Sequence, residues 1–444
     1  MFRATTLAIQ GILTTEVAFV LLSSGASAGG LPMKYVDNEK TSKGAPIVHM
    51  WDCPRPDPKA PAAGYPVLKE AQHVEVYHAT KESGGYSHHA KLAVHNGIFY
   101  AMWSNHPHGE DAPGQIVRFA ISGDGRTWSR PQQLFSRYGE IGNFNQKGPH
   151  GSAAGWIVHQ GTLYGLLGLT DCVGYANSDR SSIQDQQDAQ HAFMVRERIG
   201  MVARSANASG PQISLGPIFT LPDARKLLDP EPLTRELVPL DGSLQTVADA
   251  LHSVVKGRNP MGNLRAVDTP RPCEPVYYRA RDGNHVCLLR DDAYSHRMYV
   301  SVSADAKTWP AAQPTDIPDS PSLSDAVVLE DGTVLLIGNQ MAPKFDNPQE
   351  VSHYGRDPLM VSVSVDGYLL TRAYALRTGE QKFRVPNVGG RSGGGQYPSG
   401  LVYNGRLYGL YSMGKEDIWC SSVQLCDLGL IQSSDSQQPP ERDK

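Results

Sequence analysis

The sequence has few cysteines and no closely spaced pair of them. None of the six forms a CxxC pair, which argues against a structural zinc site built from thiolates. Charged residues make up 19% of the chain, the lysines and arginines are scattered without runs, and the formal net charge is only -4. We therefore expect no nucleic-acid-binding surface.

Long hydrophobic runs are also missing. The stretch LAIQGILTTEVAFVLL near the N-terminus is interrupted by four polar residues, so a transmembrane anchor is the weaker interpretation. The following SSGASAGG offers a small-x-small cleavage pattern at Ala26 and Ala28. Residues 1–29 are therefore predicted to be a signal peptide, and the protein is expected to be secreted, extracellular and free of the membrane.

Secretion would make the cysteines candidates for disulfides. Cys273 with Cys287 and Cys420 with Cys426 are close enough in sequence to pair. A sequon at Asn207 would be glycosylated in a eukaryotic secretory route. The polar residues 433–444 are expected to be a disordered tail, which leaves residues 30–432 for the folded domain, expected to be monomeric.

Sustained helical periodicity is absent too, with short loop helices expected only near 184–191 and 223–228. Instead, a tight polar turn ending in glycine is followed six times by an apolar strand. These turns end at Gly97, Gly161, Gly242, Gly283, Gly332 and Gly405. Their spacing averages about sixty residues, enough for a four-stranded blade with its loops. The pattern predicts an all-β protein and a single β-propeller, with six blades by this count.

A second repeat supports this architecture. ISGDGRTW and VSADAKTW are near copies, and VSVSVDGYLL is a degraded third. The pattern resembles the Asp-box of sialidase-like propellers, in which Asp and Ser hold a turn between outer strands. Asp124 and Asp305 are therefore expected to have structural roles.

Four of the fifteen histidines gather in one predicted hairpin. His88 and His89 lie in YSHHAK on its first strand, and His106 and His108 follow its second strand in HPHGED. Because paired strands bring these ends together, the histidines should be neighbours at one rim of the propeller. Each also has a structural interpretation as a loop or surface histidine. A metal site is ranked lower, since HH with HPH lacks a standard ligand spacing.

Segments such as YSHHAKLAVHNGIFYAMWSN, SHRMYVSVSADAKTW and QYPSGLVYNGRLYGLYSMGKEDI resemble the propeller family of ulvan lyases and rhamnosyl-glucuronate-cleaving enzymes. The resemblance covers roughly residues 86–418 and implies a seven-bladed propeller. The N-terminal HVEVYHAT (73–80) would then complete a sheet with C-terminal strands, which leaves no free sheet edge.

The resemblance implies a polysaccharide lyase that cleaves an L-rhamnose-α-1,4-D-glucuronate or related uronate linkage of an acidic polysaccharide by β-elimination. That reaction needs a base for the C5 proton, an acid for O4 and a cation or donor for the carboxylate. His88 and His108 match the family's paired histidines, with His89 and His106 as competitors. No cofactor is required; the resemblance allows Ca²⁺, but no run of carboxylates identifies its ligands.

Arg204 is the residue that the resemblance assigns to the substrate carboxylate, with an exposed strand arginine as the alternative. Arg297 is the runner-up. His150, predicted to open the second blade, and Tyr397, after a glycine run, complete the expected substrate-binding set with His89, His106 and Arg297. A turn histidine and a core tyrosine are the alternatives for these two positions. Tyr175 is a displaced candidate for the family's tyrosine.

Two other classes of function stay open. A hydrolase of the same fold would be an α-L-rhamnosidase or a sialidase. A sialidase requires three arginines around the substrate carboxylate and a tyrosine nucleophile with a nearby glutamate, and the sequence alone does not bring such a set together. A non-catalytic carbohydrate-binding propeller is the other class.

Overall fold

The computed structural model describes residues 33–138, 140–142, 148–175, 194–209, 212–222, 237–346, 355–385 and 392–430, the side chains of 172–175 and 194–198 excepted. All the described residues belong to one compact unit. The predicted signal peptide, the tail and the two expected loop helices lie outside the described residues. Within the described part, no helix is long and apolar enough to cross a membrane.

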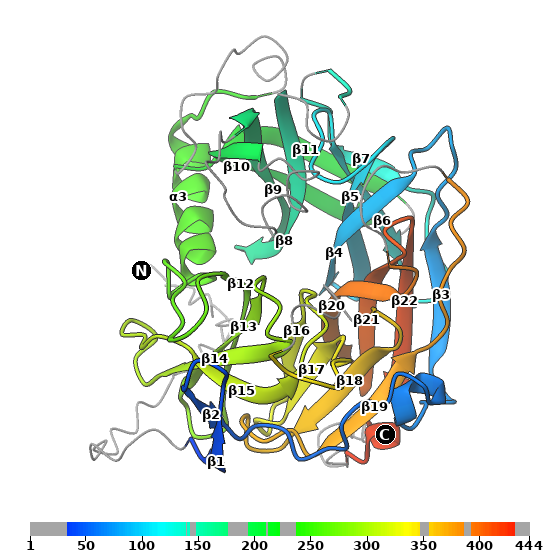
Figure 1. Ribbon diagram of the computed structural model, residues 1–444. Helices are drawn as coiled ribbons and strands as arrows, with labels where there is room; N and C mark the ends of the chain where they lie inside the picture. Colours follow the sequence, from blue (N-terminus) through cyan, green and yellow to red (C-terminus); the bar gives the residue numbers. More distant parts are fainter. Residues whose placement is uncertain are drawn as a thin grey trace, which may run out of the picture. The chain divides into compact units, whose positions relative to one another are not determined.

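The described residues form five β-sheets, each built on antiparallel strands that follow one another in the chain (Figure 1). The first contains β4 (Tyr86–His95), β5 (Ile98–His106), β6 (Ile116–Ser122) and β7 (Gln132–Phe135). The second contains β8 (Gly148–His159), β9 (Thr162–Tyr175), β10 (Met194–Ser209) and β11 (Gln212–Thr220). The third contains β12 (Pro272–Arg279), β13 (His285–Asp291), β14 (Arg297–Ser303) and β15 (Gln313–Pro318), extended by β2 (Pro46–Val48) and β1 (Tyr35–Lys40).

The fourth sheet contains β16 (Asp325–Val328), β17 (Val334–Gly338), β18 (Leu359–Ser364) and β19 (Arg372–Arg377). The fifth contains β20 (Gly395–Tyr403), β21 (Arg406–Met413), β22 (Asp417–Gln424) and β3 (Gln72–Tyr77). Among the described residues, the helices are α3 (Gly242–Gly257) and the short 3-10 helices η1 (Pro61–Gly64) and η3 (Leu425–Leu428). The all-β prediction is confirmed. Neither the seven-bladed nor the six-bladed expectation is confirmed, because the described residues contain five sheets.

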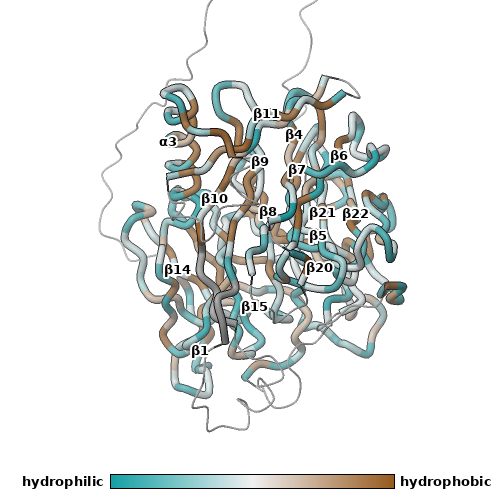
Figure 2. Tube along the Cα trace, turned by 90° about the horizontal axis from the view of Figure 1, so that it is seen from above, coloured by the Kyte–Doolittle hydropathy of each residue, from teal (hydrophilic) through white to brown (hydrophobic). Residues whose placement is uncertain are grey.

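The first strands of the sheets lie beside one another. Strand β4 contacts β8 and β20, and β16 contacts β12 and β20. Hydrophobic side chains fill the space between neighbouring sheets; Phe99 on β5, for example, packs on Tyr408 of β21 with ring centroids 4.7 Å apart. Figure 2 shows hydrophobic stretches along the strands and one side of α3. Burial of such side chains contributes roughly 2 kcal/mol each to stability.

The predicted pairing of the segment HVEVYHAT with the C-terminal strands is confirmed. Strand β3 pairs antiparallel with β22, with His73 opposite Ser421 and Val74 opposite Cys420. The fourth strand of the last sheet therefore comes from a segment more than 300 residues away in the sequence. This pairing covers an edge of β22 that would otherwise carry unpaired N–H and C=O groups.

Five of the six predicted glycine turns have the expected geometry. Gly97, Gly161, Gly283, Gly332 and Gly405 all have φ between 70° and 92° and lie between paired strands. The sixth prediction is wrong, because Gly242 begins helix α3. There Asp241 accepts hydrogen bonds from the N–H groups of Ser243 and Leu244, which caps the helix.

Helix α3 was not predicted from the sequence, although it carries a helical pattern of buried residues. Ala248 and Leu251 are fully buried and pack in a cluster with Leu166 and Phe219 of the second sheet. Their spacing of three residues, continued by Val255, places them on one face of a helix. A glycine after an aspartate therefore started a helix here instead of a hairpin.

The Asp-box turns behave as predicted. Asp124 accepts hydrogen bonds from Ser122 Oγ and from the N–H groups of Arg126 and Thr127, at 2.7–2.9 Å. Asp305 makes the corresponding bonds with Ser303 and with backbone N–H groups. Both carboxylates hold turns, in keeping with a structural role.

The predicted disulfides are wrong. Cys273 lies opposite Arg290 in the β12–β13 ladder, whereas Cys287 lies opposite Tyr277. Cys420 is buried within β22, and Cys426 is exposed in η3. The five cysteines with described side chains, all except Cys172, are free.

Candidate active site

Three first strands carry the same local irregularity. Each has a β-bulge, located between His88 and Lys91 in β4, between Cys273 and Val276 in β12, and between Gln396 and Ser399 in β20. Each bulge contains one residue with left-handed backbone, and these residues are His89 (φ 55°), Glu274 (φ 49°) and Tyr397 (φ 53°). A bulge re-aims a side chain that regular alternation would send to the other face. All three side chains belong to one polar cluster.

Tyr397 is the centre of this cluster. Its hydroxyl forms a short hydrogen bond with Glu274 Oε1 and accepts another from Arg290 Nη1 at 2.8 Å. Arg290 Nη1 also donates to Glu274 Oε2 at 2.7 Å, so one guanidinium holds the tyrosine and its carboxylate partner together. Burial and then the charge of Glu274 raise the pKa of Tyr397 well above its usual value. The phenol is therefore protonated, with a carboxylate in place to take its proton.

A second arginine lies beside the same ring. Arg356 Cζ is 5.4 Å from the centroid of Tyr397, and the arginine is only 9% exposed. Its guanidinium donates to Gln396 Oε1 and to the carbonyl of Pro321, while Nε has no hydrogen-bond partner. Arg356 therefore adds a second positive charge next to the tyrosine and keeps one donor free.

Asp319 is a buried carboxyl group near these charges. It is 1% exposed, and neither of its side-chain oxygens has a hydrogen-bond partner. Burial raises its pKa to about 8, with the carboxylate of Glu274 adding to the effect and the guanidinium groups of Arg290 and Arg356 opposing it. Asp319 is therefore mostly protonated at neutral pH.

Histidines form the other wall of the cluster. The His88 ring lies 4.1 Å from the Tyr397 ring and 4.8 Å from the His89 ring, centroid to centroid. Both imidazoles face Glu110, whose other carboxylate oxygen forms a short contact with Lys415 Nζ. Burial, followed by the charge of Lys415, holds the pKa of His88 well below its usual value, so the ring is neutral.

His106 positions the loop that carries Glu110. Its Nδ1 accepts hydrogen bonds from the N–H groups of His108 and Gly109, so the proton is on Nε2, which bonds the carbonyl of Pro113 at 3.0 Å. Burial is the main cause that lowers the pKa of His106 to about 4. His106 is a structural residue that fixes the loop as a neutral ring.

The predicted pair of His88 and His108 is not brought together. His108 is exposed and its ring packs on His106, with centroids 5.7 Å apart, whereas the ring neighbours of His88 are Tyr86, His89 and Tyr397. The loop after His106 does reach the histidine wall, but through Glu110, two residues beyond His108.

Both predicted arginines lie elsewhere. Arg204 on β10 donates to the backbone carbonyls of Gly216 and Leu134, so its guanidinium joins β11 to the segment of β7. Arg297 is buried and bonds Asp346 and the carbonyl of Thr315. The contacts of Arg204 and Arg297 are therefore with backbone carbonyls and with Asp346, and not with the residues of the cluster.

Of the remaining predicted residues, His89 and Tyr397 lie in the cluster. His150 is buried at the start of β8 and lies 3.7 Å from Asp111, next to the Glu110 loop. The side chain of Tyr175 is outside the described residues. Five charged members of the cluster were not predicted as site residues from the sequence; they are Glu110, Glu274, Arg290, Arg356 and Lys415. The similarity of Glu274-Pro275 to Tyr397-Pro398, each early in a first strand, is the one signal that could have indicated a site.

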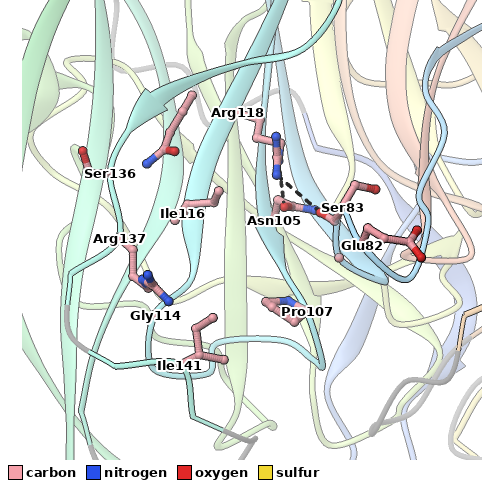
Figure 3. Close-up of a pocket in the computed structure, with 12 residues that line it drawn as sticks. Glu82, Ser83, Asn105, Pro107, Gly114, Ile116, Arg118, Ser136, Arg137 and Ile141 are labelled. Carbon is pink, nitrogen blue, oxygen red and sulfur yellow. Dashed lines mark hydrogen bonds between the residues drawn. The ribbon is translucent and has the colours of Figure 1, made fainter.

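Two cavities adjoin the cluster without containing it. One, of about 320 Å³, is lined by Lys91, Pro275, Asp325 and Pro398 and so lies along four first strands, next to the cluster. The other, of about 390 Å³, lies on the first sheet beside the Glu110 loop (Figure 3). Arg118 lines it and donates to Asn105 Oδ1 and to the carbonyl of Ser83.

The comparisons with known proteins identify the fold. Residues 237–408 match the family model of the BNR repeat-like domain, and residues 65–165 match that of the BT_1020-like, N-terminal beta propeller. A structure titled "Sialidase" superposes with a TM-score of 0.60 at 20% identity, over 85% of this chain and 35% of that one. The fold is sialidase-like.

Other solved structures resemble this sialidase-like chain less closely. Trypanosoma rangeli sialidase gives a TM-score of 0.47 at 15% identity, over 81% of this chain and 60% of its own. A protein of unknown function from Dyadobacter fermentans gives 0.47 at 14% identity, over 80% and 99%. This chain spans about a third of the length of the first sialidase. No protein with a curated description matches the sequence.

Proposed function

We propose that this protein is a glycosidase that releases a negatively charged sugar, with Tyr397 as its nucleophile. The observation that carries the proposal is the Tyr397 hydroxyl held between Glu274 and Arg290. Sialidases are the glycosidases that use a tyrosine nucleophile. A neutral phenol suits an anionic sugar, because a carboxylate nucleophile would be repelled by the substrate's own charge.

The chain's residues divide the work as follows. Arg356, with its free Nε, and Arg290 supply positive charge for the substrate carboxylate. The Tyr397 oxygen attacks the anomeric carbon while its proton passes to Glu274, and the bond to the leaving oxygen breaks as that oxygen takes a proton from solvent. Water then attacks the same carbon and gives up a proton to solvent, and Glu274 returns its proton to the departing Tyr397 oxygen.

Elimination at a uronate, the lyase chemistry implied by the sequence resemblance, is the second candidate. The observation that favours it is His88, a neutral buried ring whose Nε2 has no hydrogen-bond partner and which lies 4.1 Å from the Tyr397 ring. Such an imidazole can accept the C5 proton while the neighbouring phenol protonates O4. Rhamnosyl-glucuronate in an acidic plant or algal polysaccharide would be its substrate.

Product analysis separates the two candidates. The purified full chain would be incubated with 4-methylumbelliferyl glycosides of glucuronic acid and of 2-keto sugar acids, and separately with gum arabic. Release of the fluorophore, or of a saturated acidic sugar, supports hydrolysis. New ultraviolet absorbance from an unsaturated uronate supports elimination and overturns the hydrolase.

A variant pair then tests the nucleophile. We expect Tyr397→Phe to lower kcat by at least about 1000-fold with little change in the unfolding midpoint. Tyr403→Phe, on the same strand, is the control, because its ring packs on Phe99 outside the cluster. Near-normal hydrolysis by Tyr397→Phe would remove this tyrosine from the mechanism.

A further inference from the structure

His88 and His89 point their rings to the same place although they are consecutive residues of a strand. Regular alternation would send neighbouring side chains to opposite faces of the sheet. The β-bulge in β4 and the left-handed backbone of His89 cancel that alternation. Non-glycine residues in this conformation cost roughly 1–3 kcal/mol and tend to occur at functional sites.

The two rings meet at one carboxylate oxygen. Glu110 Oε1 lies 3.8 Å from His88 Nε2 and 3.6 Å from His89 Nε2, and the three ligand atoms lie within 4.8 Å of one another. His88 is fully buried, and its Nε2 has no hydrogen-bond partner. This nitrogen faces a second imidazole and a carboxylate, and no donor among the described residues forms a hydrogen bond with it.

Hydroxyl groups fix both rings from behind. His88 Nδ1 is 2.6 Å from Ser412 Oγ, and His89 Nδ1 is 3.2 Å from Ser104 Oγ. With Nδ1 as the donor, each Nε2 keeps its lone pair toward Glu110. Metal-binding histidines are oriented in this way by a partner on the other ring nitrogen.

We propose that His88 Nε2, His89 Nε2 and Glu110 Oε1 bind one divalent transition-metal ion of the Zn²⁺ class. Two imidazoles, a carboxylate and one open position form a known catalytic zinc donor set. Bonds of about 2.0–2.1 Å in tetrahedral geometry place ligand atoms about 3.4 Å apart, so the distances from the two histidine nitrogens to Glu110 Oε1 need only a small contraction. Ca²⁺ prefers six to eight oxygen ligands, which this set does not provide.

Lys415 is compatible with the ion, because it contacts the other oxygen of Glu110. The open coordination position would lie on the histidine wall beside Tyr397, where the carboxylate of the substrate could occupy it. This role rests on the proposed function, whereas the binding of the ion does not.

The test measures metal binding directly. The full chain, with any affinity tag removed, would be stripped with a chelator and titrated calorimetrically with ZnCl₂, and its visible spectrum recorded with Co²⁺. We expect one equivalent at the site and a tetrahedral Co²⁺ spectrum. His89→Ala and Glu110→Gln should each weaken binding by at least 100-fold, and Ser412→Ala by about 10-fold.

Two control variants make the result specific. His108→Ala, in an exposed residue of the Glu110 loop, should bind the metal normally. His78→Ala identifies any second equivalent held by Glu75, His78 and Asp417, of which Glu75 and His78 are exposed. Circular dichroism and the unfolding midpoint would show that each variant is folded.

Absence of binding in the wild type, or unchanged binding in folded His89→Ala, would overturn the proposal. Hydrolysis by a metal-free wild type would overturn the role of the ion in holding the substrate carboxylate, and would leave both the metal site and the glycosidase intact. Conversely, normal metal binding by an inactive wild type would leave the metal site standing and count against the proposed function.

Discussion

Replacement of Asp319 by asparagine should stabilise the protein, and by an amount that depends on pH. The folded pKa of about 8 lies above the ordinary value of 3.8 because the carboxyl group is buried without a hydrogen-bond partner. The folded state therefore holds this proton more tightly than the unfolded state. Stability from the protonated form is fully present below pH 3.8 and is lost as pH rises from 3.8 to 8.

The magnitude follows from that interval. For each pH unit between 3.8 and 7, the free energy of unfolding falls by roughly 1.4 kcal/mol relative to a side chain that stays neutral. At pH 7 the wild type has therefore lost about 4 kcal/mol. Asparagine has nearly the same shape and no proton to lose. We therefore expect Asp319→Asn to gain up to about 4 kcal/mol in the free energy of unfolding at pH 7, and almost nothing at pH 4.

Urea unfolding of the wild type and Asp319→Asn between pH 4 and pH 8.5 measures this difference. Asp249→Asn is the matched control, since Asp249 is exposed on α3 and bonds only Gln245 among the described contacts. A difference between the wild type and Asp319→Asn that stays constant with pH would refute the reasoning. So would a loss of stability in this variant at pH 8.

Three other predictions concern structural residues. His106→Ala should lower the free energy of unfolding by about 3 kcal/mol at pH 7, because three hydrogen bonds of a buried loop are lost. The stability advantage of the wild type over this variant should shrink as pH falls from 6.5 to about 4, where His106 becomes charged. Urea unfolding at several pH values measures the loss of stability and its pH dependence. Arg204→Met should lower the unfolding midpoint and leave kcat unchanged; a strongly reduced kcat in the folded variant would return Arg204 to the site. Asp124→Ala should cost about 1 kcal/mol by urea unfolding, with hydrolysis unaffected.

The sequence predicted local features well and the site only in part. The correct predictions depend on short patterns that can be recognised within one segment of the sequence. They concern the hairpin turns, the Asp-box turns and the pairing of β3. The site depends on contacts across sheets: Glu274 meets Tyr397 across 123 residues, and Glu110 meets Lys415 across 305. No periodicity or residue spacing in the sequence predicts such contacts.

The differences have equally specific causes. The family resemblance implies Arg204 at the substrate carboxylate, with Arg297 as the runner-up, but the same guanidinium can bind a substrate or a backbone carbonyl, and only the fold decides which. The same resemblance implies His108 as the partner of His88. In the structure the turn held by His106 moves the functional position two residues further, to Glu110.

The bulges explain why three separate first strands contribute side chains to one cluster. In a regular strand, the residues before and after His89, Glu274 or Tyr397 would share one face of the sheet, and the central side chain would point to the opposite face. One extra residue with left-handed backbone reverses that direction once, at the same stage of each strand, while the ladder beyond it continues in register. Because two of these residues precede proline, which has no N–H for the ladder, the irregularity is built into the chain itself. The polar cluster is therefore built from one irregularity repeated in the first strands of three sheets, and equivalent bulged positions are where functional residues of related sequences should be sought.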